Sequence, residues 1–482
     1  MLTLIRDQWP ALATVAGVVA VLMALAASAH AILTKREVRA AIGWVGLAWL
    51  SPLVGPVLYA TLGVNRIKRR ARELRPGHDA GEVTRAAVQR QAVETVTALG
   101  YDPGVVLLAG ATTGEELTMG NAIEPLDCGD EAYPSMLDAI ENAERSVGLC
   151  SYIFDHDQVG MRFISALEDA HRRGVQVRVL IDGVGARYSK PRTPRVLRAK
   201  GIPVAEFLSG MVPWRMPYMN LRNHRKILVV DGRVAFTGGM NIREGCMLSL
   251  DTAHPVRDLH FRLEGPVVTH IMEVFARDWT FTTGEGLDGD AWFPTLQLVG
   301  DAAARTVPDG PDDDFEKAYD TILGAIINAR TSIRIASPYF LPDETLTRAL
   351  QLAARSGRRV DVILPAVNNL RLVQWAMAAE MEHVLAPGIN VWLTPPPFDH
   401  TKLMVIDGLW VLFGSANWDS RSLRLNFELN VSSFNEPLAG RMDAFLDEKV
   451  ASARRLEAAE LNARRLPVRL RDGAVRLFSP YL

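Results

Sequence analysis

The sequence predicts an α/β fold that contains an internal repeat of one structural unit. The repeat follows a helical membrane segment. Three observations predict it: two long uncharged stretches near the N-terminus, a strand–helix pattern that recurs, and a His-x-Lys motif found once in each copy. A chain of 482 residues can hold such a segment and two domains with sizeable cores. The chain has 53 basic and 55 acidic residues, so their charges nearly cancel. The overall charge therefore does not indicate binding to nucleic acid.

The N-terminal region predicts a membrane anchor with two spans. No charged residue occurs in 11–34 or in 40–65, and each stretch exceeds the ~20 apolar residues that a spanning helix needs. A cleaved signal peptide is the alternative, because residues 27–29 (Ala-Ser-Ala) are similar to a cleavage site, but a second uncharged stretch follows. Pro52 and Pro56 also permit a re-entrant hairpin.

Basic residues beside the two stretches predict the orientation of the anchor. The run from Arg66 to Arg72 favours a cytoplasmic catalytic part under the positive-inside rule. The basic turn at residues 35–39 pulls the other way, because two spans place it on the opposite side. The longer run decides for the cytoplasmic side, and it would also attract anionic lipid headgroups.

The remainder of the chain contains one pattern twice. Residues 137–143 lead into Ser-Tyr-Ile-Phe at 151–154, and residues 323–329 lead into Ser-Pro-Tyr-Phe at 337–340, with the same spacing. In each copy a second helix and another apolar strand follow. Strands that alternate with helices in this way predict an α/β fold with mainly parallel sheets, whose two copies pack as a pseudo-dimer.

Changes in composition predict the domain boundaries. The predicted parts are a membrane anchor at 1–64, a basic juxtamembrane segment and linker at 65–122, a first repeat at 123–284, an inter-repeat linker at 285–314, a second repeat at 315–465 and a C-terminal tail at 466–482. The three cysteines, Cys128, Cys150 and Cys246, are scattered. They therefore indicate neither a disulfide framework nor a thiolate metal site.

Each copy carries the pattern HxKx4Dx6G[GS]xN. In an extended strand, residues two apart point to the same face, so the His and the Lys project together. The Asp-Gly pair predicts a hairpin, whose returning strand brings the Asn back beside them. The predicted catalytic residues are His224, Lys226, Asp231, His400, Lys402 and Asp407, and the predicted phosphate-binding residues are Asn241, Asn417, Ser415 and Gly239.

Two such surfaces face to face would hold a phosphodiester between two histidines. One imidazole attacks phosphorus and forms a phospho-histidine, while the other protonates the leaving alkoxide and then deprotonates the incoming hydroxyl. The lysines and asparagines stabilise charge on the phosphate oxygens, and this chemistry needs no metal or cofactor. A carboxylate usually holds such an imidazole in one tautomer, and Asp258 and Glu428 are the predicted histidine-orienting residues.

The duplicated motif resembles the signature of the phospholipase D superfamily. Residues 52–63, 220–226, 421–428 and 476–482 are similar to bacterial cardiolipin synthases, so the resemblance covers nearly the whole chain. It implies an enzyme of the bacterial inner membrane that converts two phosphatidylglycerol molecules into cardiolipin and glycerol through a phosphatidyl-histidine. Val256, Asp399 and Thr401 depart from the usual family residues, and Asp399 could change the proton affinity of its neighbour His400.

Three other functions remain as alternatives. A hydrolytic phospholipase D differs only in using water to resolve the intermediate, and it would release phosphatidic acid. A nuclease of the same superfamily would need a basic surface to bind nucleic acid, and the balanced charge of this chain does not predict one. A scaffold that has lost catalysis would be expected to lose a key residue, but both motifs are intact. His156 has no further ligand set at the proper spacing and is predicted to be a solvated loop histidine, and His383, on a predicted amphipathic helix at 370–385, is predicted to be structural.

Overall fold

The structure is a computed structural model that describes residues 2–35, 38–63, 94, 97, 104, 110–208, 221–311 and 314–479. The chain divides into two compact units, one of Met1–Glu73 with Met211–Asn220 and the other of Leu74–Gly210 with Leu221–Leu482. The predicted basic run at 66–72, residues 209–220 and the final residues 480–482 lie outside the described residues.

The first unit contains a long apolar helix followed by a broken one. The elements are α1 (Leu2–Thr34), α2 (Val38–Leu50), α3 (Val54–Leu58) and the π-helical turn η1 (Tyr59–Gly63). Within the part of the chain that the structure describes, one stretch, Ala13–Thr34, is long and apolar enough to cross a membrane, and Ala40–Leu50 is apolar but shorter. The predicted second span is therefore a helix interrupted at Pro52, whose ring removes a backbone donor.

Polar contacts tie the two arms of this unit together. The Tyr59 hydroxyl lies 2.7 Å from His30 Nδ1, and Lys35 Nζ donates to the Gly63 carbonyl at 2.5 Å. At the interruption a Cβ on Gly55 would lie 2.3 Å from the Leu47 carbonyl oxygen, so only glycine permits this approach. The arms thus form a helical hairpin.

The second unit has two halves that share one 15-stranded sheet, and it also contains two short two-stranded sheets. The first half contains β1 (Thr118–Asp127), α7 (Cys128–Glu141), β2 (Ser146–Ser151), α8 (Gln158–Arg172), β3 (Gln176–Asp182), α9 (Thr193–Ala199), β4 (Val204–Phe207), β5 (Ile227–Val230), β6 (Val234–Gly238), β7 (Val256–Arg257), β8 (Leu259–Glu264) and α10 (Val267–Thr283). The second half contains β9 (Ala302–Asp309), α11 (Lys317–Asn328), β10 (Ser332–Ala336), β11 (Phe340–Leu341), α12 (Glu344–Arg355), β12 (Arg359–Pro365), α13 (Arg371–Val384), β13 (Ile389–Thr394), β14 (Phe398–Asp399), β15 (Leu403–Ile406), β16 (Trp410–Gly414), β17 (Trp418–Asp419), β18 (Glu428–Phe434), α14 (Glu436–Ser452), β19 (Arg454–Arg455), α15 (Ala458–Asn462) and α16 (Leu466–Arg476).

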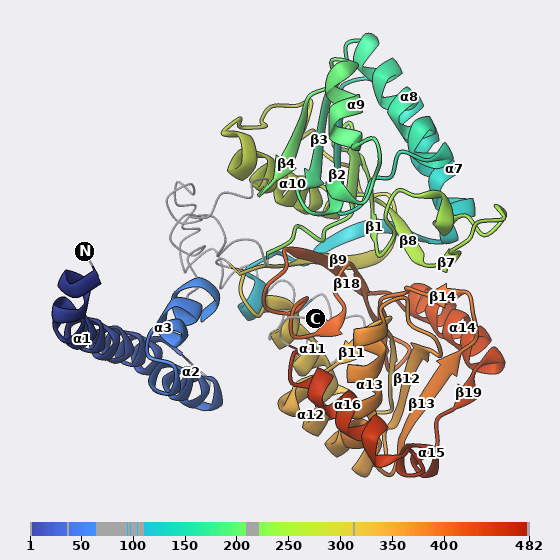
Figure 1. Cartoon of the computed structure of the whole chain (residues 1–482). Helices are drawn as coiled ribbons and strands as arrows, with labels where there is room; N and C mark the ends of the chain where they lie inside the picture. The colour runs from blue at the N-terminus through green and yellow to red at the C-terminus, as the bar shows by residue number, and fades with distance from the viewer. Residues whose placement is uncertain are drawn as a thin grey trace. The chain divides into compact units, whose positions relative to one another are not determined.

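The strand order recurs, as the repeat in the sequence predicts. The first half runs β4-β3-β2-β5-β6-β8-β1, and the second runs β13-β12-β10-β15-β16-β18-β9 in the same pattern. The halves join where β1 pairs antiparallel with β9 (Figure 1), between the first half above and the second half below. The two motif hairpins therefore occupy equivalent places.

The expectation of mainly parallel sheets is wrong. Among the described strands of the large sheet, four neighbouring pairs are parallel and ten are antiparallel. The parallel pairs come from the strand–helix–strand crossovers, such as β2 with β3 and β10 with β12. The two strands of each motif hairpin must run antiparallel, because a short turn connects them.

Helices cover both faces of the first half. Val147 and Leu149 of β2 face a core that includes residues of α7 and α8. Gly148 points to the other face, where a Cβ would lie 2.8 Å from a ring carbon of Phe275 on α10. The core of the second half is likewise formed by α11, α12 and α13 against its strands. Both motif hairpins are thus held inside a rigid frame.

Candidate active site

Two matching hairpins carry the motif residues. β5 pairs with β6 and β15 pairs with β16, both antiparallel, as the Asp-Gly signal predicts. Asp231 and Asp407 lie in the turns with φ of 52° and 56°, a left-handed conformation that aspartate tolerates. Their carboxylates accept hydrogen bonds from the backbone N–H groups of 144–146 and of 330–332.

The structure does not place these two aspartates with the histidines. Each lies past the far end of its motif strand, and each ties its hairpin turn to the strand beside it. The expectation that Asp231 and Asp407 are catalytic is therefore corrected. Their hydrogen bonds fix the hairpin from which the histidine and the lysine project.

Backbone pairing between the two halves holds each histidine. The His224 N–H donates to the Phe427 carbonyl at 2.9 Å, and the His400 N–H donates to the Arg257 carbonyl at 2.7 Å. The second contact continues a short parallel pair between β14 and β7. Each histidine therefore lies against the segment of the other half that directly precedes a predicted orienting carboxylate.

The orienting carboxylates cross between the halves. His224 Nδ1 lies 3.0 Å from Glu428 Oε2, and His400 Nδ1 lies 2.7 Å from Asp258 Oδ2. A neutral imidazole that donates its Nδ1–H to a carboxylate keeps Nε2 as a lone-pair nitrogen. Both predicted orienting residues are therefore brought to a histidine, and each serves the histidine of the other repeat.

Burial and neighbouring charges favour neutral imidazoles and charged carboxylates. Burial lowers the pKa of His224, although Glu428 opposes this shift. Burial and Lys402 lower the pKa of His400 to about 4. Burial alone would raise the pKa values of Asp258 and Glu428, but the cationic side chains beside them outweigh it and hold both below their usual range. Both histidines can therefore act as a nucleophile or a base near neutral pH.

The two lysines lie beneath the histidines. Lys226 Nζ donates to the His224 carbonyl at 2.5 Å, and Lys402 Nζ donates to the His400 carbonyl at 2.7 Å. Lys402 Nζ also lies 3.1 Å from His400 Nε2. Burial lowers the pKa of Lys226 to about 7 and that of Lys402 to about 8, so both can lose their charge near physiological pH.

The lysine pKa values predict how activity depends on pH. We expect kcat/KM to fall as the pH rises through about 7 to 8, because stabilisation of a phosphate needs charged ammonium groups. Lys226→Arg keeps its charge at these pH values, so it should move the alkaline limb up towards the pKa of Lys402. Initial rates in detergent–lipid mixed micelles measure this, and a limb that does not move with Lys226→Arg would contradict it.

The four predicted phosphate-binding residues divide into two pairs. Asn241 and Asn417 line the same cavity as the histidines, and Asn417 donates from Nδ2 to the Ser422 hydroxyl at 3.2 Å. Ser415 instead donates its hydroxyl to Glu428 Oε2 at 2.5 Å. At the equivalent position, a Cβ on Gly239 would lie 2.4 Å from Asp258 Oδ1. Ser415 and Gly239 therefore position the orienting carboxylates.

The histidines open onto a cavity of about 370 Å³ lined by both halves. Its wall includes Tyr152 and Tyr339, whose rings make edge-on contacts with His224 and His400 at centroid distances of 5.0 and 6.1 Å. Among the described residues, no group of three or more His, Cys, Asp or Glu is arranged to hold a metal ion. The cavity is therefore a basic and aromatic chamber centred on the two imidazoles.

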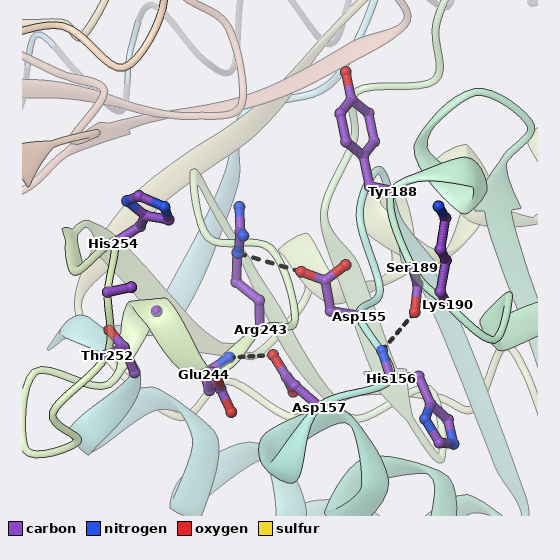
Figure 2. Close-up of a pocket in the computed structure, with 12 residues that line it drawn as sticks. Asp155, His156, Asp157, Tyr188, Ser189, Lys190, Arg243, Glu244, Thr252 and His254 are labelled. Carbon is purple, nitrogen blue, oxygen red and sulfur yellow. Dashed lines mark hydrogen bonds and ion pairs between the residues drawn. The ribbon is translucent and has the colours of Figure 1, made fainter.

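A smaller pocket of about 280 Å³ adjoins this chamber and shares Tyr188 and Arg243 with it. Figure 2 shows Arg243 reaching towards Asp155, and its Nε lies 3.3 Å from the Asp155 carboxylate. His156 also lines this pocket, and its backbone N–H donates to the Ser189 hydroxyl at 2.7 Å. Among the charged side chains that line this pocket, Arg243 and Asp155 form an ion pair.

Arg225 is a site residue that the motif pattern did not single out. It stands between His224 and Lys226, so on an extended strand it points to the opposite face. Its buried guanidinium donates to Asp278 Oδ1 at 2.5 Å, to the Glu428 carbonyl at 2.9 Å and to the Asp309 carbonyl at 3.1 Å. Arg225 thus joins the two halves directly behind His224.

Asp399 has a partner other than its neighbour His400. Its Oδ2 lies 2.6 Å from Nζ of Lys449 on α14, and both side chains are buried. The carboxylate beside the second histidine is therefore neutralised from behind, and Asp258 remains the carboxylate that contacts His400.

This buried ion pair predicts a stability effect. We expect Lys449→Met to lower the free energy of unfolding by about 3–5 kcal/mol, because Asp399 would remain as a buried charge without its cation. The double variant Lys449→Met/Asp399→Leu should recover most of the loss, since neither charge remains. Urea unfolding of the detergent-solubilised protein measures both, and equal losses in the two variants would contradict the prediction.

The duplicated sheet and the crossed histidine–carboxylate pairs define a phospholipase D-like protein. The family described as "Cardiolipin synthase, PLD-like domain" (PLD standing for phospholipase D) matches residues 136–279 and 322–450. These residues make up more than half of the chain, and the chain belongs to this family.

Relatives and solved structures agree with this placement. The chain is 29% identical over 453 residues to a cardiolipin synthase of Geobacillus kaustophilus, covering 93% of this chain and 90% of the relative. It is 31% identical over 369 residues to cardiolipin synthase 1 of Staphylococcus epidermidis, covering 76% and 75%. The crystal structure of a phosphatidylserine synthase from Haemophilus influenzae shares the fold, with a TM-score of 0.61 at 15% identity, over 78% of this chain and 99% of that one.

Proposed function

We propose that the chain is a phosphatidyltransferase that makes cardiolipin and glycerol from two phosphatidylglycerol molecules. One observation carries the proposal: two histidines on one cavity, each with its Nδ1 engaged by a carboxylate from the other half. This arrangement presents two equivalent imidazoles to one phosphodiester, as transfer through a covalent intermediate requires.

The reaction proceeds in two displacements. In the first, Nε2 of the neutral histidine bonds to phosphorus and the bond from phosphorus to the glycerol oxygen breaks. The other histidine, which must carry a proton on Nε2 for this step, gives that proton to the leaving alkoxide and becomes neutral. In the second, that histidine takes the proton of a hydroxyl on the second phosphatidylglycerol. The hydroxyl oxygen then bonds to phosphorus and the phosphorus–nitrogen bond breaks.

The other motif residues support these steps. Lys226, Lys402, Asn241 and Asn417 stabilise the charge that develops on the phosphate oxygens. Asp258 and Glu428 hold the imidazole tautomers, with Gly239 and Ser415 placing those carboxylates. The two repeats act together as a pseudo-dimer in which each completes the site of the other.

The first unit anchors the enzyme in a bacterial inner membrane. The span Ala13–Thr34 and the interrupted helix after it form a two-pass hairpin, with the catalytic part on the cytoplasmic side. The phospholipid substrate then lies in the same membrane as the anchor, and nucleic acid is not a partner.

The proposal is tested with purified protein in phosphatidylglycerol vesicles that contain a metal chelator. Equimolar cardiolipin and glycerol would support it. Phosphatidic acid without cardiolipin would instead assign a hydrolytic phospholipase D, in which water resolves the intermediate. No product in any lipid mixture would favour a membrane scaffold that has lost catalysis.

A further inference from the structure

The wall of the catalytic cavity is not symmetric, although the motifs at its centre are. Two residues before His224 stands Arg222, whereas two residues before His400 stands Phe398, and both line the cavity. The Phe398 ring contacts the His400 ring at a centroid distance of 5.8 Å. The cavity therefore has an apolar flank near His400 and a cationic flank that includes Arg222.

A second guanidinium joins this cationic flank from the other half. Arg421 lines the cavity on a turn where the N–H groups of Arg421 and Ser422 both donate to Asp419 Oδ1, at 2.9 and 2.8 Å. Burial and the positive charge of Arg222, which lines the same cavity, lower the pKa of Arg421.

Backbone hydrogen bonds fix Arg222 and Arg421 in place. The Arg222 carbonyl accepts a hydrogen bond from the Phe427 N–H at 2.8 Å. The carbonyl of the same Phe427 accepts the hydrogen bond from the His224 N–H. The Arg421 carbonyl accepts from the N–H groups of Leu425 and Asn426 at 2.8 and 3.0 Å. Arg222 therefore belongs to the seam that also positions His224, and Arg421 lies in the turn that leads to Phe427 of that seam.

Some of the other charges on the wall are paired within the protein, and Arg222 itself donates to the Leu221 carbonyl at 2.8 Å. Arg243 faces Asp155, as Figure 2 shows. Asp258 is bound to His400, and burial raises the pKa of Asp419 to about 6, so this carboxylate is still mostly charged at neutral pH and offsets part of the Arg421 charge. Two like charges close together are unfavourable, and an anion between them would relieve the repulsion.

We infer that Arg222 and Arg421 bind the phosphate of the acceptor lipid, the second phosphatidylglycerol. This inference rests on the proposed function and adds to it the site of the second substrate. The two phosphates of cardiolipin are joined through one glycerol, so the acceptor phosphate must lie inside the same cavity while its hydroxyl attacks the first. Guanidinium groups bind phosphate through paired, charge-assisted hydrogen bonds, and two of them suit one phosphate.

The subsite acts on only one of the two displacements. Cleavage of the donor needs one phosphate between the histidines and none at Arg222 and Arg421. Free glycerol and water carry no phosphate, so they resolve the phosphatidyl-histidine without help from the arginines. The pair therefore favours a lipid acceptor over glycerol or water.

The experiment compares two reactions of the same purified full-length protein in phosphatidylglycerol mixed micelles. Exchange of labelled glycerol into phosphatidylglycerol reports donor cleavage and resolution without an acceptor phosphate. Cardiolipin formation reports the complete reaction. We expect Arg222→Gln and Arg421→Gln each to lower the ratio of cardiolipin formation to glycerol exchange about tenfold or more. Arg222→Lys and Arg421→Lys, which keep the charge, should recover part of it.

Arg424→Gln is the matched control. Arg424 lies one turn from Arg421, but it is paired with Glu316 at 3.3 Å and Asp343 at 3.2 Å and does not line the cavity. Its variant should keep the wild-type ratio, and retained glycerol exchange shows that each variant is folded.

Two results would overturn the inference while the proposed function stands. One is an equal fall in both reactions, which would place the arginines in donor binding or in folding. The other is an unchanged ratio in the double variant Arg222→Gln/Arg421→Gln. Wild-type protein that performs neither reaction would instead overturn the proposed function itself.

Discussion

Cardiolipin formation is expected to fall by about a thousandfold or more when either His224 or His400 is replaced by alanine. Each imidazole performs a covalent or proton-transfer step that nothing else in the cavity can perform at the same place, and such steps contribute about 10²- to 10⁴-fold each. The rate of cardiolipin formation from labelled phosphatidylglycerol measures the loss.

Acid-quench trapping of labelled lipid on the protein adds a second readout. The variant without the nucleophile forms no covalent adduct, whereas the variant without the acid can still form one slowly. His383→Ala is the control, because His383 lies on α13 and does not line the cavity. Retention of a tenth or more of the wild-type rate by either active-site variant would contradict the paired-histidine mechanism.

Replacing an orienting carboxylate is expected to damage the histidine of the other repeat. Glu428→Gln should lower activity by about 10²- to 10⁴-fold, because a neutral amide no longer fixes the Nδ1–H tautomer of His224. Asp258→Asn should do the same through His400. Rates of cardiolipin formation measure both losses.

Nitrogen-15 NMR of the imidazoles distinguishes this crossed assignment from pairing within one repeat. Glu428→Gln should shift only the resonance that is missing in His224→Ala, and Asp258→Asn only the one missing in His400→Ala. Glu285→Gln, which removes a carboxylate paired with Arg178 on the surface, should shift neither. A shift of the histidine in the same repeat would refute the crossed pairs.

Much of this architecture follows from local patterns. The repeat predicts two equivalent halves, and the Asp-Gly signal predicts the hairpins β5–β6 and β15–β16, which begin directly after the His-x-Lys residues. The prediction of a mainly parallel sheet rests on the alternation of helices and strands, which indicates parallel crossover pairs such as β2 with β3. The alternation contains no information about the strands that pair antiparallel, such as β8 and β18. The break in the second apolar stretch follows from Pro52. The same proline also permitted the interpretation of this stretch as a re-entrant hairpin.

The crossing of the carboxylates could not be predicted from the sequence. A position downstream of each motif is compatible with pairing in either half, and the choice depends on contacts such as His224 with Phe427. Asp231 and Ser415 were misassigned for a related reason. Both belong to the motif by spacing, but a hairpin carries one to its far end and turns the other towards Glu428.

The crossed pairs have a consequence for genetics. A lesion at Asp258 maps to the first repeat, but its chemical phenotype belongs to the histidine of the second, and the reverse holds for Glu428. Neither repeat can therefore decay alone or be improved alone. Natural selection therefore acts on the two repeats as a single heritable trait, although they are separate segments of the sequence.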